Sequence, residues 1–135
     1  MPCKCGKRGC LDTLASLRSI GNVAREAGLP TDPLALDCLA SDGNHDAITI
    51  LHRAGAALGL AISHIAQTLD PERIVVAVTE GLADGLYARV MRQTVEANLM
   101  PHETRQVQLT TIGVDQQAWA IGAASMAAGR ALFRL

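Results

Sequence analysis

The spacing of apolar side chains predicts three helices in the first half of the chain. Apolar residues recur at helical spacing over 11–27, and Gly28-Leu29-Pro30 would end that helix. A short helix is predicted over 33–40, because proline suits the first helical position. A longer helix is predicted over 45–69, where apolar residues follow one another at steps of three or four and form a stripe.

Two strands are predicted in the second half. Residues 74–78 form a continuous apolar run rich in β-branched side chains, which is typical of a strand covered on both faces. Residues 107–112 alternate apolar with polar side chains, which predicts a half-buried strand. With the helices between and after them, the strands predict an α/β fold in which helices pack on a small parallel sheet.

Two more helices are predicted around these strands. One covers 81–99 and ends at Pro101, and the other covers 116–135 after a capping Asp115. Within the long helix, Gly55 and Gly59 lie one turn apart and would let another element approach closely. Two strands alone form a marginal sheet, so we expect this chain to be the C-terminal part of something longer.

Composition and charge exclude several classes of protein. The 135 residues have 49% hydrophobic side chains and a net charge of -1, so a domain built mainly to hold nucleic acid or an anionic membrane is not expected. Aromatic residues make up 2%, too few for a base-stacking platform. We see neither a run of about 18 apolar residues nor a signal peptide, and therefore expect a cytoplasmic protein without a membrane partner.

Three of the four cysteines, Cys3, Cys5 and Cys10, lie within the first ten residues. A disulfide framework would usually spread its cysteines along the chain, whereas thiolates clustered around glycines can wrap around one ion. Zinc prefers four tetrahedral sulfur or nitrogen ligands, so these residues predict a zinc site that needs a fourth ligand. The alternative is three reduced cysteines that bind no metal.

The segment Cys-x-Cys-Gly-x-x-Gly-Cys-Leu-Asp, followed by a helix, resembles the zinc motif of the ROK family. That family groups bacterial sugar-responsive transcriptional repressors with sugar kinases. The resemblance continues in the family's order through residues 58–61, residues 69–76 and Gly122-Ala123-Ala124. It covers essentially the whole chain, and the cysteine motif is its most specific part.

The resemblance implies part of the C-terminal lobe of an actin-like ATPase (ribonuclease H-like) fold. Residues 1–135 would form a single domain that begins at the cysteine motif (1–12) and is truncated at its N-terminus. It also implies that Cys3, Cys5 and Cys10 bind structural zinc. The family's fourth ligand is a histidine just upstream of the first cysteine, so this site is expected to be incomplete. The four histidines of this chain are expected to be ordinary helix or loop residues; they are His45, His52, His64 and His102.

The resemblance also identifies a candidate ligand-binding residue. Asp12 stands where the family has a sugar-contacting glutamate, and its shorter carboxylate could still accept hydroxyl hydrogen bonds. Equally, Asp12 could be a first-turn acid that the helix dipole favours. Where many relatives have a glycine pair that admits nucleotide, this chain has Val78-Thr79-Glu80-Gly81, and Glu80 would repel phosphate.

Together these features predict the effector-sensing C-terminal part of a ROK-type transcriptional regulator that responds to a sugar or sugar phosphate. It would not be catalytic by itself, would contact DNA only through a missing N-terminal region, and would form a homo-oligomer through the apolar helices over 45–69 and 116–135. The alternative is the C-terminal lobe of a ROK sugar kinase similar to glucokinase, active only if its N-terminal lobe is supplied.

Two further interpretations are less favoured. Residues 22–37 resemble a small helix-turn-helix DNA-binding module, but the would-be recognition helix from Asp32 to Asp37 has two acids and no Lys or Arg. A stand-alone enzyme would need a histidine near Cys10 or a Cys-x-x-Cys motif, and the sequence has neither. Cys38 is predicted to be a small buried hydrophobic residue in a helix.

Overall fold

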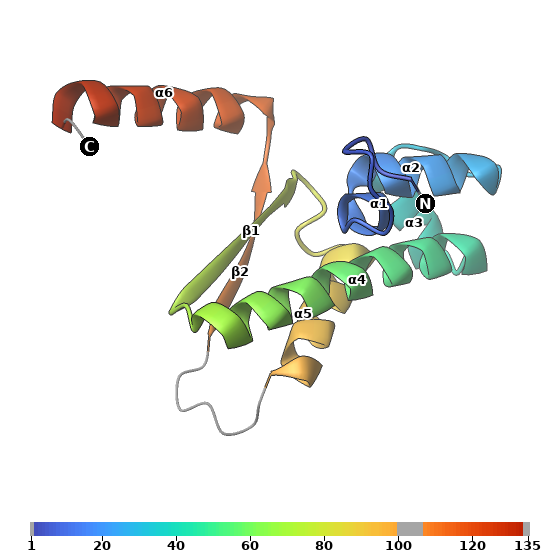
Figure 1. The fold of residues 1–135 in the computed structure, drawn as a ribbon. Coiled ribbons are helices and arrows are strands. Elements are labelled where there is room, and N and C mark those ends of the chain that lie inside the picture. Colours follow the sequence, from blue (N-terminus) through green and yellow to red (C-terminus); the bar gives the residue numbers. More distant parts are fainter. Residues whose placement is uncertain (1, 100–106, 134–135) are drawn as a thin grey trace.

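Helices alternate with two strands through the computed structural model, which describes residues 2–99 and 107–133. This order confirms the α/β class that the apolar pattern predicts (Figure 1). The elements, in chain order, are α1 (Asp12–Ala15), α2 (Leu17–Glu26), α3 (Pro33–Ser41), α4 (His45–Leu69), β1 (Arg73–Thr79), α5 (Leu86–Asn98), β2 (Gln108–Val114) and α6 (Gln116–Phe133).

The first predicted helix is divided into two at Ser16. This residue has extended backbone angles, φ -71° and ψ 147°, and its hydroxyl oxygen accepts a hydrogen bond from the Ser19 amide at 3.1 Å. Serine is a favoured N-cap because its side chain satisfies a free amide of the first turn. The prediction of one continuous helix over 11–27 is therefore wrong, and the chain turns between α1 and α2.

The observed bounds of α3 and α4 agree closely with those of the predicted helices. Asp32 caps α3 through the Ala35 amide at 2.9 Å, and Asn44 caps α4 through the Ala47 amide at 3.0 Å. The bounds of α4 are those predicted, and α3 ends one residue later than expected. The prediction that Cys38 is buried is wrong, because its side chain lies on the exposed side of α3.

The closest packing in the structure joins α4 to α5. A Cβ atom added at Gly55 would lie 2.5 Å from the Tyr87 carbonyl oxygen, and one added at Gly59 would lie 2.6 Å from that of Met91. Only glycine lets the two backbones approach so closely, which confirms the close approach predicted from the spacing of these residues. In the described part of the chain, α4 alone also has the length and hydropathy of a membrane-spanning helix, as core helices often do.

The core lies where α4 meets α2, α3 and α5. Its fully buried aliphatic side chains include Leu36 from α3 and Leu51 from α4. A smaller cluster between α4, α5 and the sheet contains Ile62, Met91 and Val95. The buried members of the main cluster are Ile20, Ala24, Leu36, Ala40, Ala47, Leu51, Ala54, Val78, Leu82 and Tyr87.

The two strands pair in parallel, in register from Arg73 opposite Gln108 to Thr79 opposite Val114. One face of the sheet packs on the helices, while Val75 on the other face is 53% exposed. The expectation that the first strand is covered on both faces is therefore wrong within the described residues. Its apolar run reflects strand propensity on the open face as well as burial on the packed one.

The bounds of α5 and β2 differ from those predicted, whereas α6 begins at the predicted residue. α5 begins at Leu86, because residues 80–85 form a turn, and it ends at Asn98; Pro101, its predicted end, lies outside the described residues. β2 extends two residues beyond the predicted strand. The Asp115 carboxylate caps α6 through the Ala118 amide at 2.9 Å, as predicted. Figure 1 shows α6 extending from the end of β2, away from the other helices.

Candidate metal centre and neighbouring pockets

The cysteines lie in a tight loop that precedes α1. The Cys3 amide donates to the Lys7 carbonyl at 2.8 Å, and the Gly6 amide donates to the Cys3 carbonyl at 3.0 Å. Gly6 and Gly9 have φ angles of 83° and 73°, a left-handed conformation that glycine adopts without steric cost. The two glycines of the motif thus fold the loop back and turn its cysteine side chains inward.

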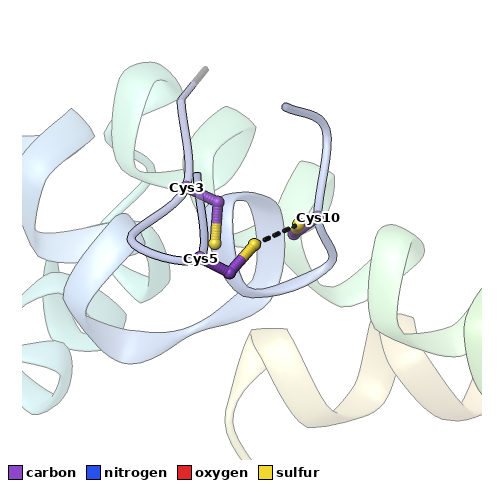
Figure 2. Close-up of side chains that lie close together, drawn as sticks. All are labelled: Cys3, Cys5 and Cys10. Atoms are coloured by element: carbon purple, nitrogen blue, oxygen red, sulfur yellow. Dashed lines mark hydrogen bonds between the residues drawn. The ribbon is translucent and has the colours of Figure 1, made fainter. Parts of the chain in front are cut away.

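The three thiols converge, as the motif predicts. The sulfur atoms of Cys3, Cys5 and Cys10 all lie within 4.8 Å of one another, and those of Cys5 and Cys10 are 3.5 Å apart (Figure 2). Tetrahedral zinc with Zn–S bonds of about 2.3 Å separates its sulfur ligands by about 3.8 Å. The three cysteines could therefore hold a metal ion with little rearrangement.

Hydrogen bonds shift the pKa values of Cys5 and Cys10 in opposite directions. A backbone hydrogen bond at Lys7 lowers the pKa of Cys5, and hydrogen bonds with the thiols of Cys10 and Cys3 lower it further. Hydrogen bonds with the thiols of Cys5 and Cys3 raise the pKa of Cys10 to about 11, with the one to Cys5 as the largest cause. Without metal, Cys5 thus ionises more readily than Cys10, and a bound cation would favour the thiolate form of its ligands.

No other part of the described chain adds a fourth ligand to the three cysteines. Among residues 2–99 and 107–133, the cluster consists of the three cysteines. His45, His52 and His64 all lie on α4 and do not join it. His102 lies outside the described residues.

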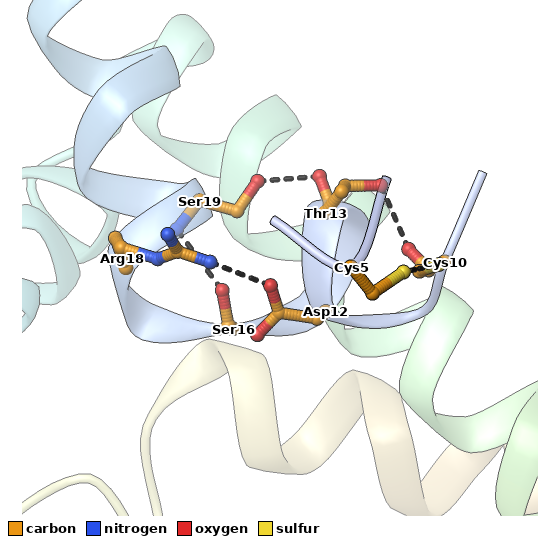
Figure 3. Close-up of polar contacts among 7 residues, drawn as sticks. All are labelled: Cys5, Cys10, Asp12, Thr13, Ser16, Arg18 and Ser19. Carbon is orange, nitrogen blue, oxygen red and sulfur yellow. Dashed lines mark hydrogen bonds and ion pairs between the residues drawn. The ribbon is translucent and has the colours of Figure 1, made fainter. Parts of the chain in front are cut away.

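Asp12 lies at the start of α1 and pairs with a residue that the sequence did not single out. Its Oδ2 atom accepts a hydrogen bond from the Arg18 guanidinium at 2.6 Å (Figure 3). Both side chains are about half exposed, so the pair adds little to stability, but it orients the carboxylate. The break at Ser16 brings Arg18 back to Asp12, and no local pattern in the sequence indicates this contact.

A pocket of about 230 Å³ lies beside this ion pair, between the cysteine loop and α2. Hydrogen bonds shape its wall: the Thr13 hydroxyl donates to the Cys10 carbonyl and the Ser19 hydroxyl donates to the Thr13 carbonyl. Among its other lining side chains, Lys4 and Asn22 can donate hydrogen bonds, and Asp12 and Glu26 can accept them. Its lining residues are Pro2, Lys4, Asp12, Thr13, Arg18, Ser19, Asn22, Val23 and Glu26.

A larger pocket, about 620 Å³, opens where both strands end. The carboxyl ends of parallel strands are the usual place for ligands in α/β proteins. Glu80, from the turn after β1, and Asp115, after β2, both line it. The other lining residues are Ala15, Ser16, Leu17, Leu58, Val76, Ala77, Val78, Thr79, Leu82, Tyr87 and Val114.

Comparison with known proteins gives a consistent result. A sequence model described as the ROK family matches residues 1–130. The N-acetylmannosamine kinase of Citrobacter koseri is 28% identical over 127 residues, which is 94% of this chain and 42% of the relative. The glucokinase of Halalkalibacterium halodurans is 29% identical over 131 residues, which is 84% of this chain and 40% of the relative. The chain thus spans less than half the length of these relatives.

Solved structures share the fold. A ROK family transcriptional regulator, a homolog of the E. coli MLC protein, superposes with a TM-score of 0.70 and 25% identity over 92% of this chain and 34% of that one. A ROK glucokinase from Streptomyces griseus, in complex with glucose and AMPPNP, gives a TM-score of 0.73 and 20% identity over 93% of this chain and 46% of that one. The predicted fold class, part of an actin-like ATPase fold with helices on a small parallel sheet, is confirmed.

Proposed function

The chain belongs to the ROK family, and on that premise we propose that it is the sugar-sensing C-terminal lobe of a ROK-type transcriptional regulator. In this proposal residues 1–135 form one domain that begins at the cysteine motif. Cys3, Cys5 and Cys10 hold a structural zinc ion, and Asp12 contacts the effector. The lobe acts in the cytoplasm and is not catalytic by itself.

The observation that supports this proposal most directly is the convergence of the three thiols immediately before Asp12. When bound, zinc would supply a structural tie between the two ends of the cysteine loop. Cys10 stands two residues before Asp12, and its carbonyl accepts the Thr13 hydroxyl at 2.7 Å. A loop fixed at Cys10 would therefore also fix the first turn of α1 and the carboxylate on it.

The geometry of Asp12 suits contact with a sugar hydroxyl. Arg18 engages only Oδ2 in the described structure, so Oδ1 can accept a hydrogen bond from a ligand in the adjacent pocket. Lys4 and Asn22, which also line this pocket, could donate to hydroxyl or phosphate oxygens of the same ligand. This combination accommodates a sugar or a sugar phosphate as the effector.

The turn after β1 favours a regulator over a kinase. Val78-Thr79-Glu80-Gly81 lacks the glycine pair of nucleotide-binding relatives, and Glu80 lines the pocket at the strand ends. A regulator binds its effector but transfers no phosphate, so an acid at this position does not interfere with its function. DNA binding and self-association, both expected of such a regulator, would use residues outside this site.

The second candidate is the corresponding lobe of a ROK sugar kinase. The observation in its favour is that curated relatives matched over most of this chain are named as kinases. Such a lobe would phosphorylate a sugar only together with a phosphate-binding lobe. The α2–α3 segment is a weaker candidate for DNA binding, because α3 packs on α4 and α5 and its Leu36 is fully buried.

Calorimetric titration of the zinc-loaded protein with glucose and N-acetylmannosamine tests sugar binding. We expect Asp12→Ala to weaken binding by on the order of tenfold or more, since a hydrogen bond to a charged group is lost. Asp42→Ala, which removes an exposed carboxylate outside both pockets, is the matched control and should bind like the parent. Equal sugar affinity of the two variants would show that Asp12 does not contact the sugar.

A coupled assay for ADP release tests the kinase alternative. We expect no ATP-dependent turnover with common hexoses above that of a Cys3→Ser control, because a lobe without the phosphate-cradling elements cannot position a γ-phosphoryl group. Turnover that exceeds the control would overturn the non-catalytic assignment and favour the kinase.

A further inference from the structure

The pocket at the strand ends has an unusual distribution of charge. Its two charged lining residues are Glu80 and Asp115, and no Lys, Arg or His lines it in the described structure. Most of the remaining wall is aliphatic, including Leu17, Leu58 and Leu82. A concave apolar site with few, convergent polar groups is the usual form of a small-molecule pocket, and its size is within the common range of about 300–1,000 Å³.

The backbone that carries Glu80 is fixed against β2, and the carboxylates of Glu80 and Asp115 lie at exposed positions. The Glu80 amide donates to the Val114 carbonyl at 3.1 Å, which continues the parallel pairing beyond the strand. A Cβ atom at Gly113 would lie 3.3 Å from the Glu80 Cα, so the turn lies tightly against β2. Asp115 uses one carboxylate oxygen to cap α6, which leaves the other for a ligand.

The helix that follows β1 offers no alternative site for phosphate. In many nucleotide-binding folds, phosphate binds to free amides at such a helix N-terminus. Here the Leu86 amide, in the first turn of α5, donates to the Asp37 carboxylate of α3 at 2.7 Å. A Cβ at Gly85 would lie 3.0 Å from that carboxyl group. An internal anion thus already occupies the N-terminus of α5.

We propose that the pocket at the carboxyl ends of β1 and β2 binds a small hydrogen-bond-donating molecule without negative charge, and that its acids exclude phosphorylated ligands. Glu80 and Asp115 would accept hydrogen bonds from hydroxyl or ammonium groups, while the aliphatic wall packs on the apolar part of the ligand. Ligands of this chemistry are neutral polyols and protonated amino sugars. The inference goes beyond the proposed function, because this pocket shares no lining residue with the one beside Asp12.

A series of hexoses that differ mainly in charge tests this assignment: glucosamine, glucose and glucose 6-phosphate. The measurement is the change in backbone amide NMR chemical shifts of the ¹⁵N-labelled full chain as each sugar is added. Changes at Thr79, Glu80 and Val114 would report binding in this pocket, and changes at Asp12 and Thr13 would report binding in the other. We expect glucosamine and glucose to shift the first group, with glucose 6-phosphate binding there about tenfold more weakly than glucose because of repulsion by two acids.

The paired variant Glu80→Gln with Asp115→Asn removes both charges while Asn retains the ability to cap α6. We expect it to bring the affinity for glucose 6-phosphate to within about twofold of that for glucose, because the repulsion between the two acids and the phosphate is lost. Asp42→Asn is the matched control, because it removes one exposed acid that lines neither pocket and should leave this order unchanged.

Several outcomes would overturn the inference. One is binding of glucose 6-phosphate or AMPPNP at the Thr79 group of amides as tightly as glucose in the parent protein. Another is the absence of shifts there with both glucose and glucosamine. If sugars shift only the amides of Asp12 and Thr13, the proposed function survives and this inference fails. If they shift only the amides of Thr79, Glu80 and Val114, this inference survives and the proposed role of Asp12 fails.

Discussion

Tyr87 links the segment that follows the cysteine loop to the core at the scale of single residues. Its hydroxyl donates to the Ala15 carbonyl at the end of α1, at 3.0 Å, and the side chain is 6% exposed. Burial raises the pKa of Tyr87 from 10.0 to about 12, because the phenolate would lose its hydration. The neutral phenol is therefore the form that the folded protein favours.

This shift predicts a loss of stability at high pH. Because the folded pKa is the higher one, the stabilisation is complete below pH 10 and is lost as pH rises from 10 towards 12, by about 2–3 kcal/mol. Tyr87→Phe should cost about 1–2 kcal/mol at neutral pH, since the Ala15 carbonyl loses its partner. Urea unfolding at several pH values should show a smaller alkaline decline in the variant.

The titration has a direct optical check, because Tyr87 is the single tyrosine of the sequence. Phenolate absorbance should rise with a midpoint well above the ordinary value for tyrosine as long as the protein stays folded. A midpoint near 10 in the folded protein would contradict the buried, hydrogen-bonded position of this side chain.

The cysteine cluster gives a second prediction for single residues. Cys5→Ser removes the sulfur that lies 3.5 Å from that of Cys10, so two thiolates remain and zinc affinity should fall by more than about 100-fold. Metal analysis after gel filtration should find zinc with the parent protein and almost none with the variant. Cys38→Ser is the control, because that cysteine lies on α3 away from the cluster; equal zinc in all three proteins would rule out the site.

The packing of α4 on α5 depends on glycine. Gly59 allows α4 to lie against Met91 and Thr94 of α5, where an added Cβ would lie 2.6 Å from both the Met91 carbonyl oxygen and the Thr94 Cβ. Gly122, on α6, has no atom within 4 Å of such a position among the described residues. The same residue type therefore serves close packing in α4, whereas on α6 it packs on nothing among the described residues of one chain.

The two glycines predict opposite effects of one substitution. Gly59→Ala should destabilise the protein by about 1–3 kcal/mol, because the clash with α5 outweighs the gain in helix propensity. Gly122→Ala should leave stability unchanged or raise it by up to about 1 kcal/mol, since only helix propensity changes. Chemical denaturation of both variants measures the difference, and equal effects would mean that α4 and α5 do not pack as described.

Exposed apolar surface is the main feature at the scale of the whole molecule. On α6, Ile121 is 65% and Met126 is 71% exposed, and Leu69 at the end of α4 is also 71% exposed. The open face of the sheet adds Val75 and Ile112. Large exposed apolar patches are rare in monomers and commonly mark interaction surfaces.

We therefore predict that the chain forms a homo-oligomer, or is poorly soluble, through α6 and the exposed part of α4. Sedimentation equilibrium should show species heavier than 14.2 kDa at high micromolar concentration. Replacing both Ile121 and Met126 by Glu should shift the distribution towards the monomer, because charge on that face opposes its burial. A monomeric parent protein that binds no dye for apolar surface would contradict this prediction.

Sequence patterns were sufficient to predict the features that depend on contacts between residues close together in the chain. The 3.6-residue period defines the bounds of α4, and Asp115 caps α6 because the capping contact spans three residues. The convergence of Cys3, Cys5 and Cys10 follows from a short loop with two glycines, and so it was predictable from spacing alone. The parallel pairing of the strands followed from their order with an intervening helix.

By itself, then, the amino-acid sequence determined the element order, the family and the cysteine cluster, whereas packing between distant segments decided the rest. Asp37 caps α5 across 49 residues, and Arg18 reaches Asp12 only because Ser16 ends α1. Cys38 is exposed and β1 is open on one face because neighbouring elements cover only part of each surface. Such contacts depend on which surfaces meet in three dimensions, and residue spacing along one element contains no information about its partner.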